Sequence, residues 1–236
     1  MDVEVLRTGS RGVFVEELQR LLNKKLPHRT PLEPDGIFGS LTRQAVIAYQ
    51  RAQWLTPDGV VGPCTWSALK DWETIHIDWP VRLIPQPTED TCWAAATGML
   101  LNRGGPVRAP AGMDVDGGLL NDSGTNDAAN MTRFARAFNL TLVHGQSWTV
   151  AGFAQLMRAR GPLMLNILWN DRAYASGRDS PGHMVVVSGM RGVEMPNAAT
   201  LRVHDPAPVG RGTIDAVIYG PYMRRYPTST YQILHR

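Results

Sequence analysis

The run Gln86-Pro-Thr-Glu-Asp-Thr-Cys92-Trp93-Ala-Ala-Ala96 gives the strongest indication of fold, because it places a cysteine at the start of an alanine-rich helical pattern. Thr91 or Asp90 can cap such a helix, so Cys92 meets free N–H groups and the positive end of the helix dipole. Both features favour the thiolate, which is the attacking form of cysteine. Gln86 lies six residues earlier, from where its amide can donate to an oxyanion beside the Cys92 N–H.

Two later segments supply the partners that a cysteine nucleophile needs. Gly182-His183-Met-Val-Val-Val-Ser-Gly189 predicts a buried strand with a histidine near its start. Leu201-Arg-Val-His-Asp205-Pro206 predicts a shorter strand that ends at an acid and a turn. A nucleophile, a base and a group that orients the base thus follow one another along the chain. We expect His183 to take the proton from Cys92 and Asp205 to hold the imidazole in the correct tautomer.

Each of these segments also has a plain structural interpretation. A lone cysteine is most often simply buried, and a histidine at a strand start or an Asp-Pro turn is common without catalysis. Asp215 is the alternative acid, although no strand followed by a turn presents it. The combination favours catalysis by Cys92, His183 and Asp205, with Gln86 as the oxyanion donor.

Roughly residues 80–236 resemble the papain-like cysteine peptidases, most closely the bacterial branch of secreted effectors and bacteriocin-leader peptidases. The matching pieces are Gln86 to Trp93, the strand-like Gly161-Pro-Leu-Met-Leu-Asn-Ile167, Gly182-His183 with its valine run, and Val203 to Pro206. The resemblance implies one subdomain with the Cys92 helix, a β-sheet subdomain with His183 and Asp205, and an active site between them. Many relatives carry Asn where this chain has Asp205.

The first third of the chain is a different unit, built on a repeat. Asp35-Gly-Ile-Phe-Gly-Ser-Leu-Thr-Arg-Gln-Ala-Val46 returns 23 residues later as Asp58-Gly-Val-Val-Gly-Pro-Cys-Thr-Trp-Ser-Ala-Leu69. Each copy predicts an Asp-Gly turn and then a helix with a threonine in its first turn. Four apolar residues on one face predict an earlier helix: Val15, Leu18, Leu21 and Leu22. We therefore expect a small three-helix bundle built on a duplicated loop-helix unit.

Residues 4–71 resemble the peptidoglycan-binding module of many cell-wall hydrolases. The resemblance runs from Leu6-Arg-Thr-Gly-Ser10 through the first repeat to Tyr49-Gln50. It implies that this unit docks the protein on peptidoglycan. The repeat by itself requires only the fold, and it does not say which side chains touch a ligand.

We therefore expect an α+β chain with a small helical bundle at residues 1–72 and a papain-like two-subdomain cysteine peptidase at residues 80–236. The chain has 236 residues, of which 43% are hydrophobic and 19% charged, so it can build both cores. The stretch 71–80, with Trp72 and Trp79, predicts a packed connection. Because a nucleophile must stay free, we expect no disulfide between Cys92 and Cys64, and we interpret Cys64 as packing filler.

Several function classes are disfavoured by composition and spacing. The net charge is +3, the basic residues are scattered, and no zinc-finger spacing or phosphate loop occurs, so we expect no nucleic-acid partner. None of the six histidines lies in a His-Glu-x-x-His motif, and Asp114-Val-Asp116 lacks the later ligands of a calcium loop. We expect neither a metal nor a cofactor. No apolar run reaches about 18 residues, so we expect no membrane span.

The start of the chain, Met1-Asp-Val-Glu-Val-Leu-Arg7, does not have the pattern of a secretory signal peptide. We expect synthesis in a bacterial cytoplasm without a signal peptide. Action in the periplasm or in a target cell then requires type VI-like or other non-classical secretion, or phage-type lysis.

Three functions fit these observations. The first is a cysteine-dependent hydrolase of stem or cross-link amides in peptidoglycan, for which injection as an antibacterial effector is one mode of delivery. The second is a papain-like protease toxin that cleaves a protein in a target cell, and the third is a catalytically dead wall-binding adaptor. The four candidate residues count against the third. Peptidoglycan, a peptide or protein substrate and an immunity protein are the partners that these hypotheses imply.

Overall fold

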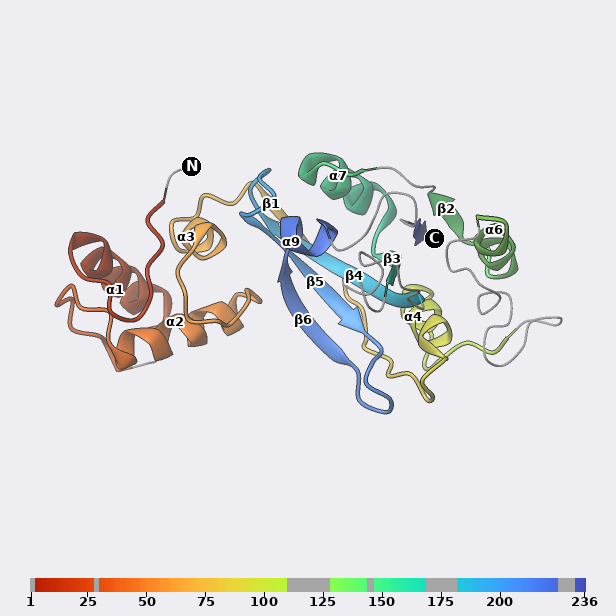
Figure 1. Cartoon of the computed structure of the whole chain (residues 1–236), viewed down its shortest axis with the longest axis horizontal. Helices are drawn as coiled ribbons and strands as arrows, with labels where there is room; N and C mark the ends of the chain where they lie inside the picture. The colour runs from red at the N-terminus through yellow and green to blue at the C-terminus, as the bar shows by residue number, and fades with distance from the viewer. Residues whose placement is uncertain (1–2, 28–29, 110–127, 144–146, 169–181, 225–231) are drawn as a thin grey trace, which may run out of the picture.

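The computed structural model describes residues 3–27, 30–109, 128–143, 147–168, 182–224 and 232–236 (Figure 1). Its helices are α1 (Val13–Lys25), α2 (Ser40–Ala52), α3 (Pro63–Leu69), α4 (Cys92–Leu100), α6 (Ala128–Ala137), α7 (Val150–Arg160) and α9 (Tyr219–Arg224). Its strands are β1 (Ile75–Asp78), β2 (Thr141–Val143), β3 (Leu163–Leu168), β4 (Gly182–Gly192), β5 (Ala199–Asp205), β6 (Thr213–Ile218) and β7 (Gln232–His235). A helical module lies at one end of the molecule, and a sheet with its helices forms the rest.

The helical module is the predicted three-helix bundle. The amphipathic pattern of α1 buries Leu18 and Leu22, and α2 adds Val46 and Tyr49 to the same hydrophobic cluster. α3 has Pro63 at its first position, where the missing N–H costs no helix hydrogen bond. The bundle therefore has a core of its own, separate from the clusters around the sheet.

Two matching polar clusters explain why the Asp-Gly repeat recurs, and each depends on a buried glutamine from the preceding helix. In the first cluster, Gln19 Nε2 donates to Asp35 Oδ1 at 2.8 Å and lies 3.2 Å from Thr42 Oγ1. The second cluster makes the same contacts at 2.9 and 3.2 Å, in Gln50, Asp58 and Thr65. Each glutamine Oε1 also accepts the N–H of the glycine in its turn. The turns are thereby tied to the helices, so the repeat specifies the fold.

Within the described residues, seven strands form one antiparallel sheet in the order β2-β7-β3-β4-β5-β6, with β1 paired to β4. β4 is the central strand. Its first half pairs with β3 and its last residues pair with β1, while β5 lies on its other side. β6 is the strand at one edge of this order.

Both faces of the sheet are covered, which accounts for the unbroken apolar run of β4. Met184 and Val186 belong to the hydrophobic cluster of α4 and α6, whereas Val185 and Val187 belong to that of α7 and α9. The observed architecture is the expected α+β chain, in which a helical bundle precedes a mixed helix-and-sheet domain. The α4 helix packs directly on β3 and β4, and this contact brings the start of α4 to the sheet.

The stretch between the two predicted domains is part of the sheet. Residues 71–80 were expected to form a packed connection, and they include β1, which pairs with Gly189 to Gly192 of β4. Sequence alone does not identify this strand because it has only four residues, Ile75–Asp78, and its partner lies far along the chain.

Four residues, which we call the interdomain clamp, fix the module against the sheet: Arg191, Glu73, Gln53 and Trp54. The buried Arg191 guanidinium donates to both Glu73 carboxylate oxygens, at 2.8 and 2.6 Å, and to the Gln53 carbonyl at 2.5 Å. It also lies 5.4 Å from the centroid of the Trp54 ring. Trp54 has a φ of 41°, a left-handed conformation that is unusual for a bulky residue. A Cβ on Gly189 would stand 2.8 Å from the Ile77 carbonyl oxygen and 3.3 Å from the Trp54 indole, so this glycine makes room first for β1 and then for the indole.

Candidate active site

His183 and Asp205 meet on neighbouring parts of β4 and β5. Asp205 is the last residue of β5, and His183 is the second residue of β4. His183 Nε2 lies 2.7 Å from Asp205 Oδ1, and His183 is almost fully buried. Asp205 Oδ1 also accepts the Ala207 N–H at 2.8 Å, which fixes the carboxylate. The structure therefore brings together the two residues predicted to be base and acid, whose roles stay a prediction, and it leaves Nδ1 as the ring nitrogen that can face a nucleophile.

Cys92 is the first residue of α4, as the sequence predicts. Thr91 takes the N-cap position, but its side chain makes no capping hydrogen bond. Its Oγ1 instead accepts the Thr88 N–H at 2.9 Å and donates to the Thr88 carbonyl at 3.0 Å. The predicted side-chain cap is therefore wrong, because the preceding turn already uses the hydroxyl. Cys92 still stands at the positive end of the helix.

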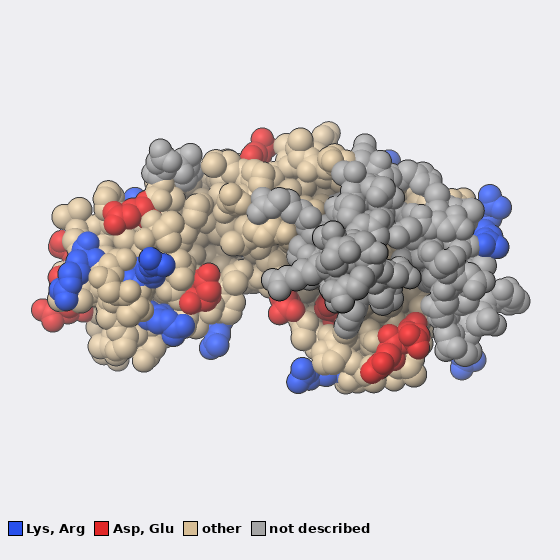
Figure 2. Space-filling view, in the orientation of Figure 1, with Lys and Arg blue, Asp and Glu red and all other residues tan. Residues whose placement is uncertain are grey.

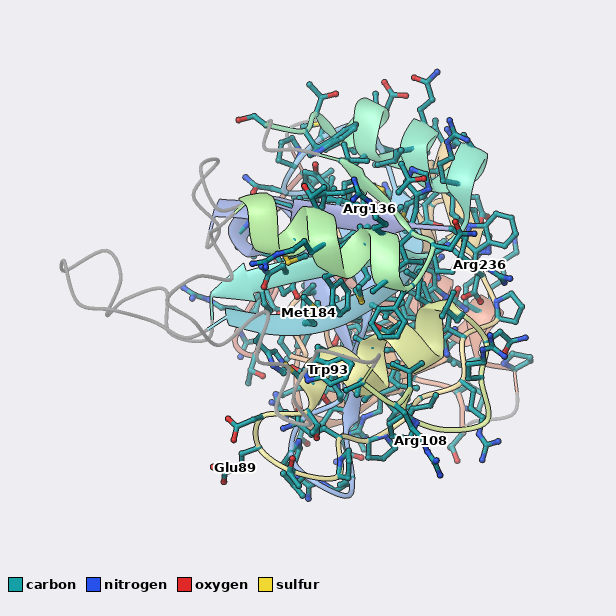
Figure 3. All side chains as sticks on the ribbon, turned by 90° about the vertical axis from the view of Figure 1, so that its right-hand side faces the viewer. Glu89, Trp93, Arg108, Arg136, Met184 and Arg236 are labelled. Atoms are coloured by element: carbon teal, nitrogen blue, oxygen red, sulfur yellow. The ribbon has the colours of Figure 1, made fainter. Side chains whose placement is uncertain are left out.

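Trp93, the neighbour of the candidate nucleophile, anchors α4. Its buried ring contacts Phe134 and Phe138, with centroids 6.2 and 6.1 Å away. In Figure 3, Trp93 lies on α4 near Met184 of β4, and Glu89 projects outward from the loop before the helix. The start of α4 is thus held by the packing of the residue that follows Cys92.

His183 interacts with Cys92 as well as with Asp205. Burial lowers the pKa of His183, but hydrogen bonds to Asp205 and to Cys92 raise it by more, to about 9. At neutral pH the imidazole therefore carries a proton and lies beside the Cys92 sulfur. This arrangement can attack an electrophilic carbon and then protonate a leaving group.

Gln86 is buried in the loop before α4. Its backbone pairs with the segment after β5, because its N–H donates to the Pro206 carbonyl and its carbonyl accepts the Gly210 N–H. Its side-chain Nε2 donates to the carbonyls of Thr88 and Glu89, at 2.9 and 3.1 Å. Donation to an oxyanion requires the exchange of one of these bonds, so this role of Gln86 stays a prediction.

The alternative acid Asp215 and the neighbouring His204 both lie outside this pair. Asp215 lies on β6, opposite Val203, and its Oδ2 accepts a hydrogen bond from Thr213. His204 is buried beside Ser188, and burial, followed by the charge of Arg202, lowers its pKa to about 4. Asp205 is therefore the acid that the structure brings to His183.

Among the described residues, no three His, Cys, Asp or Glu side chains are grouped so that they could hold a metal ion. The incomplete calcium-loop pattern at Asp114 to Asp116 lies outside the described residues. In the described part of the chain, no helix combines the length and the apolar character needed to cross a membrane.

Comparison with protein families agrees with this division of the chain. Residues 11–69 match the putative peptidoglycan binding domain, and residues 73–217 match the papain-like cysteine protease AvrRpt2. The protein is thus a peptidoglycan-binding domain fused to a papain-like cysteine protease domain. Because the second match covers more than half of the chain, the chain belongs to the papain-like cysteine protease AvrRpt2 family.

Two individual proteins share parts of the sequence. An uncharacterized protein encoded in the bpoA1 3' region of Kitasatospora aureofaciens is 38% identical over 77 residues, which are 33% of this chain and 64% of that protein. The chain therefore spans less than two thirds of the length of this relative. The crystal structure of Burkholderia AP3 phage endolysin is 35% identical over 42% of this chain and 34% of its own, with a TM-score of 0.27.

Proposed function

We propose that the protein is a cysteine-dependent hydrolase that cuts stem-peptide or cross-link amides of peptidoglycan after docking through its helical module. The observation that carries this proposal is the fusion itself: a peptidoglycan-binding domain at residues 11–69 and a papain-like protease domain at residues 73–217 in one chain. The interdomain clamp supports joint action, because it holds the two domains in one arrangement.

The chemistry follows from the arrangement of the candidate residues. The Cys92 thiolate attacks the carbonyl carbon of the amide, and the Cys92 N–H with Gln86 stabilises the oxyanion. His183 gives its proton to the departing amine, which leaves a thioester on Cys92. His183 then takes a proton from water, the hydroxide attacks the thioester, and the thiol is released with a carboxylic acid. Asp205 accepts the Nε2–H of His183 and so keeps Nδ1 directed at the reacting atoms.

A second function has support from the protease family. A papain-like protease cuts peptide bonds of proteins, so the chain could act as a toxin on a protein in a target cell, with the helical module as a docking aid. Delivery by a type VI-like route, a place of action outside the producing cytoplasm and a neutralising immunity protein belong to this proposal as well as to the first. A catalytically dead adaptor is disfavoured by the His183–Asp205 pair, which a pure binding protein does not need.

The decisive experiment uses insoluble sacculi. The full chain is incubated with purified sacculi, the pellet is assayed for bound protein, and mass analysis identifies the released muropeptides. We expect binding by the wild type and by Cys92→Ala, and new amide-cleaved fragments with the wild type only. Intact sacculi after incubation with active enzyme would contradict the proposal.

The compartment of toxicity separates the two functions. A wall hydrolase kept in the cytoplasm does not meet its substrate, so we expect expression there to be harmless. With an added export signal it should round or lyse the cells, and Cys92→Ala should not. Cysteine-dependent killing from the cytoplasm, with intact sacculi, would favour the protein-cleaving toxin.

A further inference from the structure

A groove with a volume of about 540 Å³ lies between the helical module and the edge of the sheet (Figure 2). One wall is Arg51 and residues 54–57 of the module, and the other comes from β5, β6 and Tyr222. This volume falls in the range of sites that bind small ligands, so the groove suits a short chain and not a folded partner. Asp205 is among its lining residues, whereas Cys92 is not.

The β6 strand offers main-chain hydrogen bonds to the groove. Thr56 Oγ1 donates to the Ala216 carbonyl at 2.9 Å, so this carbonyl points away from β5. In an antiparallel ladder the N–H and C=O of one residue point to the same side, and the direction alternates along the strand. The N–H of Ala216 and both main-chain groups of Ile214 therefore also point away from β5, along the edge that borders the groove. Such an edge can pair with an extended peptide.

Charged side chains of both signs stand on the two walls. Arg51 lies in the last turn of the α2 helix, is exposed and makes no ion pair with the residues that the structure describes. On the opposite wall, Arg202 is already paired with Asp78, at 2.9 Å, and Asp215 supplies a carboxylate. A carboxylate-bearing short peptide with a free amine is complementary to this distribution, with Arg51 as its unpaired cationic contact.

The groove also reaches the catalytic pair. Asp205 lines the groove and at the same time holds His183 through its Oδ1. A peptide that lies along β6 therefore extends from the wall-binding module to Asp205, the member of the His183–Asp205 pair that lines the groove.

We propose that this groove binds a peptidoglycan stem peptide, paired with the β6 edge and held by Arg51 through a carboxylate. The inference rests on the proposed function and names a substrate-binding site for it outside the Cys92 cleft. A stem peptide is favoured over a protein segment because the module forms one wall, the groove is short, and a stem peptide carries free carboxylates.

The test compares variants of the full chain on a soluble synthetic stem peptide, in a free-carboxylate and an amidated form. In the Cys92→Ala background, Arg51→Gln should raise the dissociation constant for the carboxylate form by roughly tenfold, the usual size of a charge-assisted hydrogen bond, and much less for the amidated form. Ala216→Pro removes only an outward N–H, which an edge strand tolerates, and in the same background it should raise the dissociation constant for both forms. Arg43→Gln, an exposed arginine on the same helix outside the groove, is the matched control and should behave as wild type. Melting temperatures check that each variant is folded.

The outcomes separate this inference from the proposed function. If the wild type cleaves the stem peptide and both groove variants bind it as tightly as Cys92→Ala alone does, the groove inference is overturned and the proposed function stands. If the wild type does not cleave it, the proposed function fails. Titration of the peptide into Cys92→Ala, with and without Arg51→Gln, then still decides whether the groove binds it. Equal competition by an all-L peptide of the same charge would assign the groove to protein segments and overturn the stem-peptide assignment.

Discussion

The starts of α3 and α4 each carry one of the two cysteines, and they differ in what surrounds the sulfur. Cys64 is the second residue of α3, and its Sγ lies 3.4 Å from the Asn197 carbonyl. Burial raises the pKa of the Cys64 thiol. Cys92 is the first residue of α4 and interacts with the imidazole of His183. Both are free thiols at helix starts, so we expect the histidine partner, and not the helix dipole alone, to decide which of them is the nucleophile.

The largest expected effect comes from removing the sulfur at α4. Cys92→Ala should abolish turnover, because no other group can form the thioester, and the melting temperature should stay close to that of wild type, since alanine suits a helix. Hydrolysis of a stem peptide or a model amide measures the effect. Wild-type turnover in Cys92→Ala would end the cysteine-hydrolase interpretation.

His183, the partner that Cys92 has and that distinguishes it from Cys64, is held by Asp205. Asp205→Ala should lower kcat by about 10²–10⁴-fold, less than His183→Ala, because an orienting group is less essential than the proton carrier. Asp205→Asn should retain more activity, since an amide oxygen can still accept the Nε2–H. Asp215→Ala is the matched control on β6 for kcat only, because Asp215 lines the proposed peptide groove and its loss can change peptide binding. Loss of activity in the control with full activity in Asp205→Ala would show that the other acid serves His183.

Besides the histidine partner, the start of α4 is predicted to have a second feature that the start of α3 lacks, which is stabilisation of an oxyanion by Gln86. Gln86→Ala should lower kcat by about 10²–10³-fold and leave weak residual activity. Because Gln86 also bonds to Thr88 and Glu89, the melting temperature must be measured alongside. A full loss of stability would assign Gln86 to holding the loop, and unchanged kcat in a folded variant would remove it from the oxyanion site.

The pH dependence should follow His183 and not Cys64. The folded pKa of His183, about 9, lies above its usual value near 6.5, so the pairing stabilises the fold fully below about pH 6.5. That stabilisation is lost as the pH rises through about 9. We expect the difference in melting temperature between wild type and His183→Ala to shrink over this window, and kcat to fall as the imidazolium loses its proton. A difference that stays constant from pH 6 to 10 would contradict the raised pKa.

The smallest effect is expected at α3. Cys64→Ala should leave kcat and KM as in wild type, and a thiol reagent at pH 7 should label Cys92 much faster than Cys64, as peptide mapping can show. Equal labelling rates would mean that the helix start matters more than the histidine partner.

The sequence predicts those parts of the molecule that depend on nearby residues. The start of α4 at Cys92, the end of β5 at Asp205 and the duplicated Asp-Gly turns all follow from local patterns. The meeting of His183 with Asp205 follows from the usual order of nucleophile, base and orienting group, which the antiparallel pairing of β4 and β5 then satisfies.

Contacts between distant segments could not be predicted in this way. Nothing local marks Gln86 as a partner of the segment after β5, or Arg191 as a partner of Glu73, 118 residues away. The side-chain cap by Thr91 failed for a related reason, because Thr88 competes for the same hydroxyl. Local composition gives the residue types at a site, whereas the competition among their hydrogen bonds is settled by the fold.

The interdomain clamp gives the proposed enzyme a fixed reach. With Arg191 bonded to Glu73 and Gln53, a module anchored at one point of a polymer would hold the nucleophile at a set radius from that point. The cleaved bonds would then cluster around each point where the module is bound, and the module would have to dissociate before the enzyme could move along the polymer. If the clamp were loosened, the active site would reach bonds over a wider area around each anchoring point, and the distance between the anchoring point and the cut would become less regular.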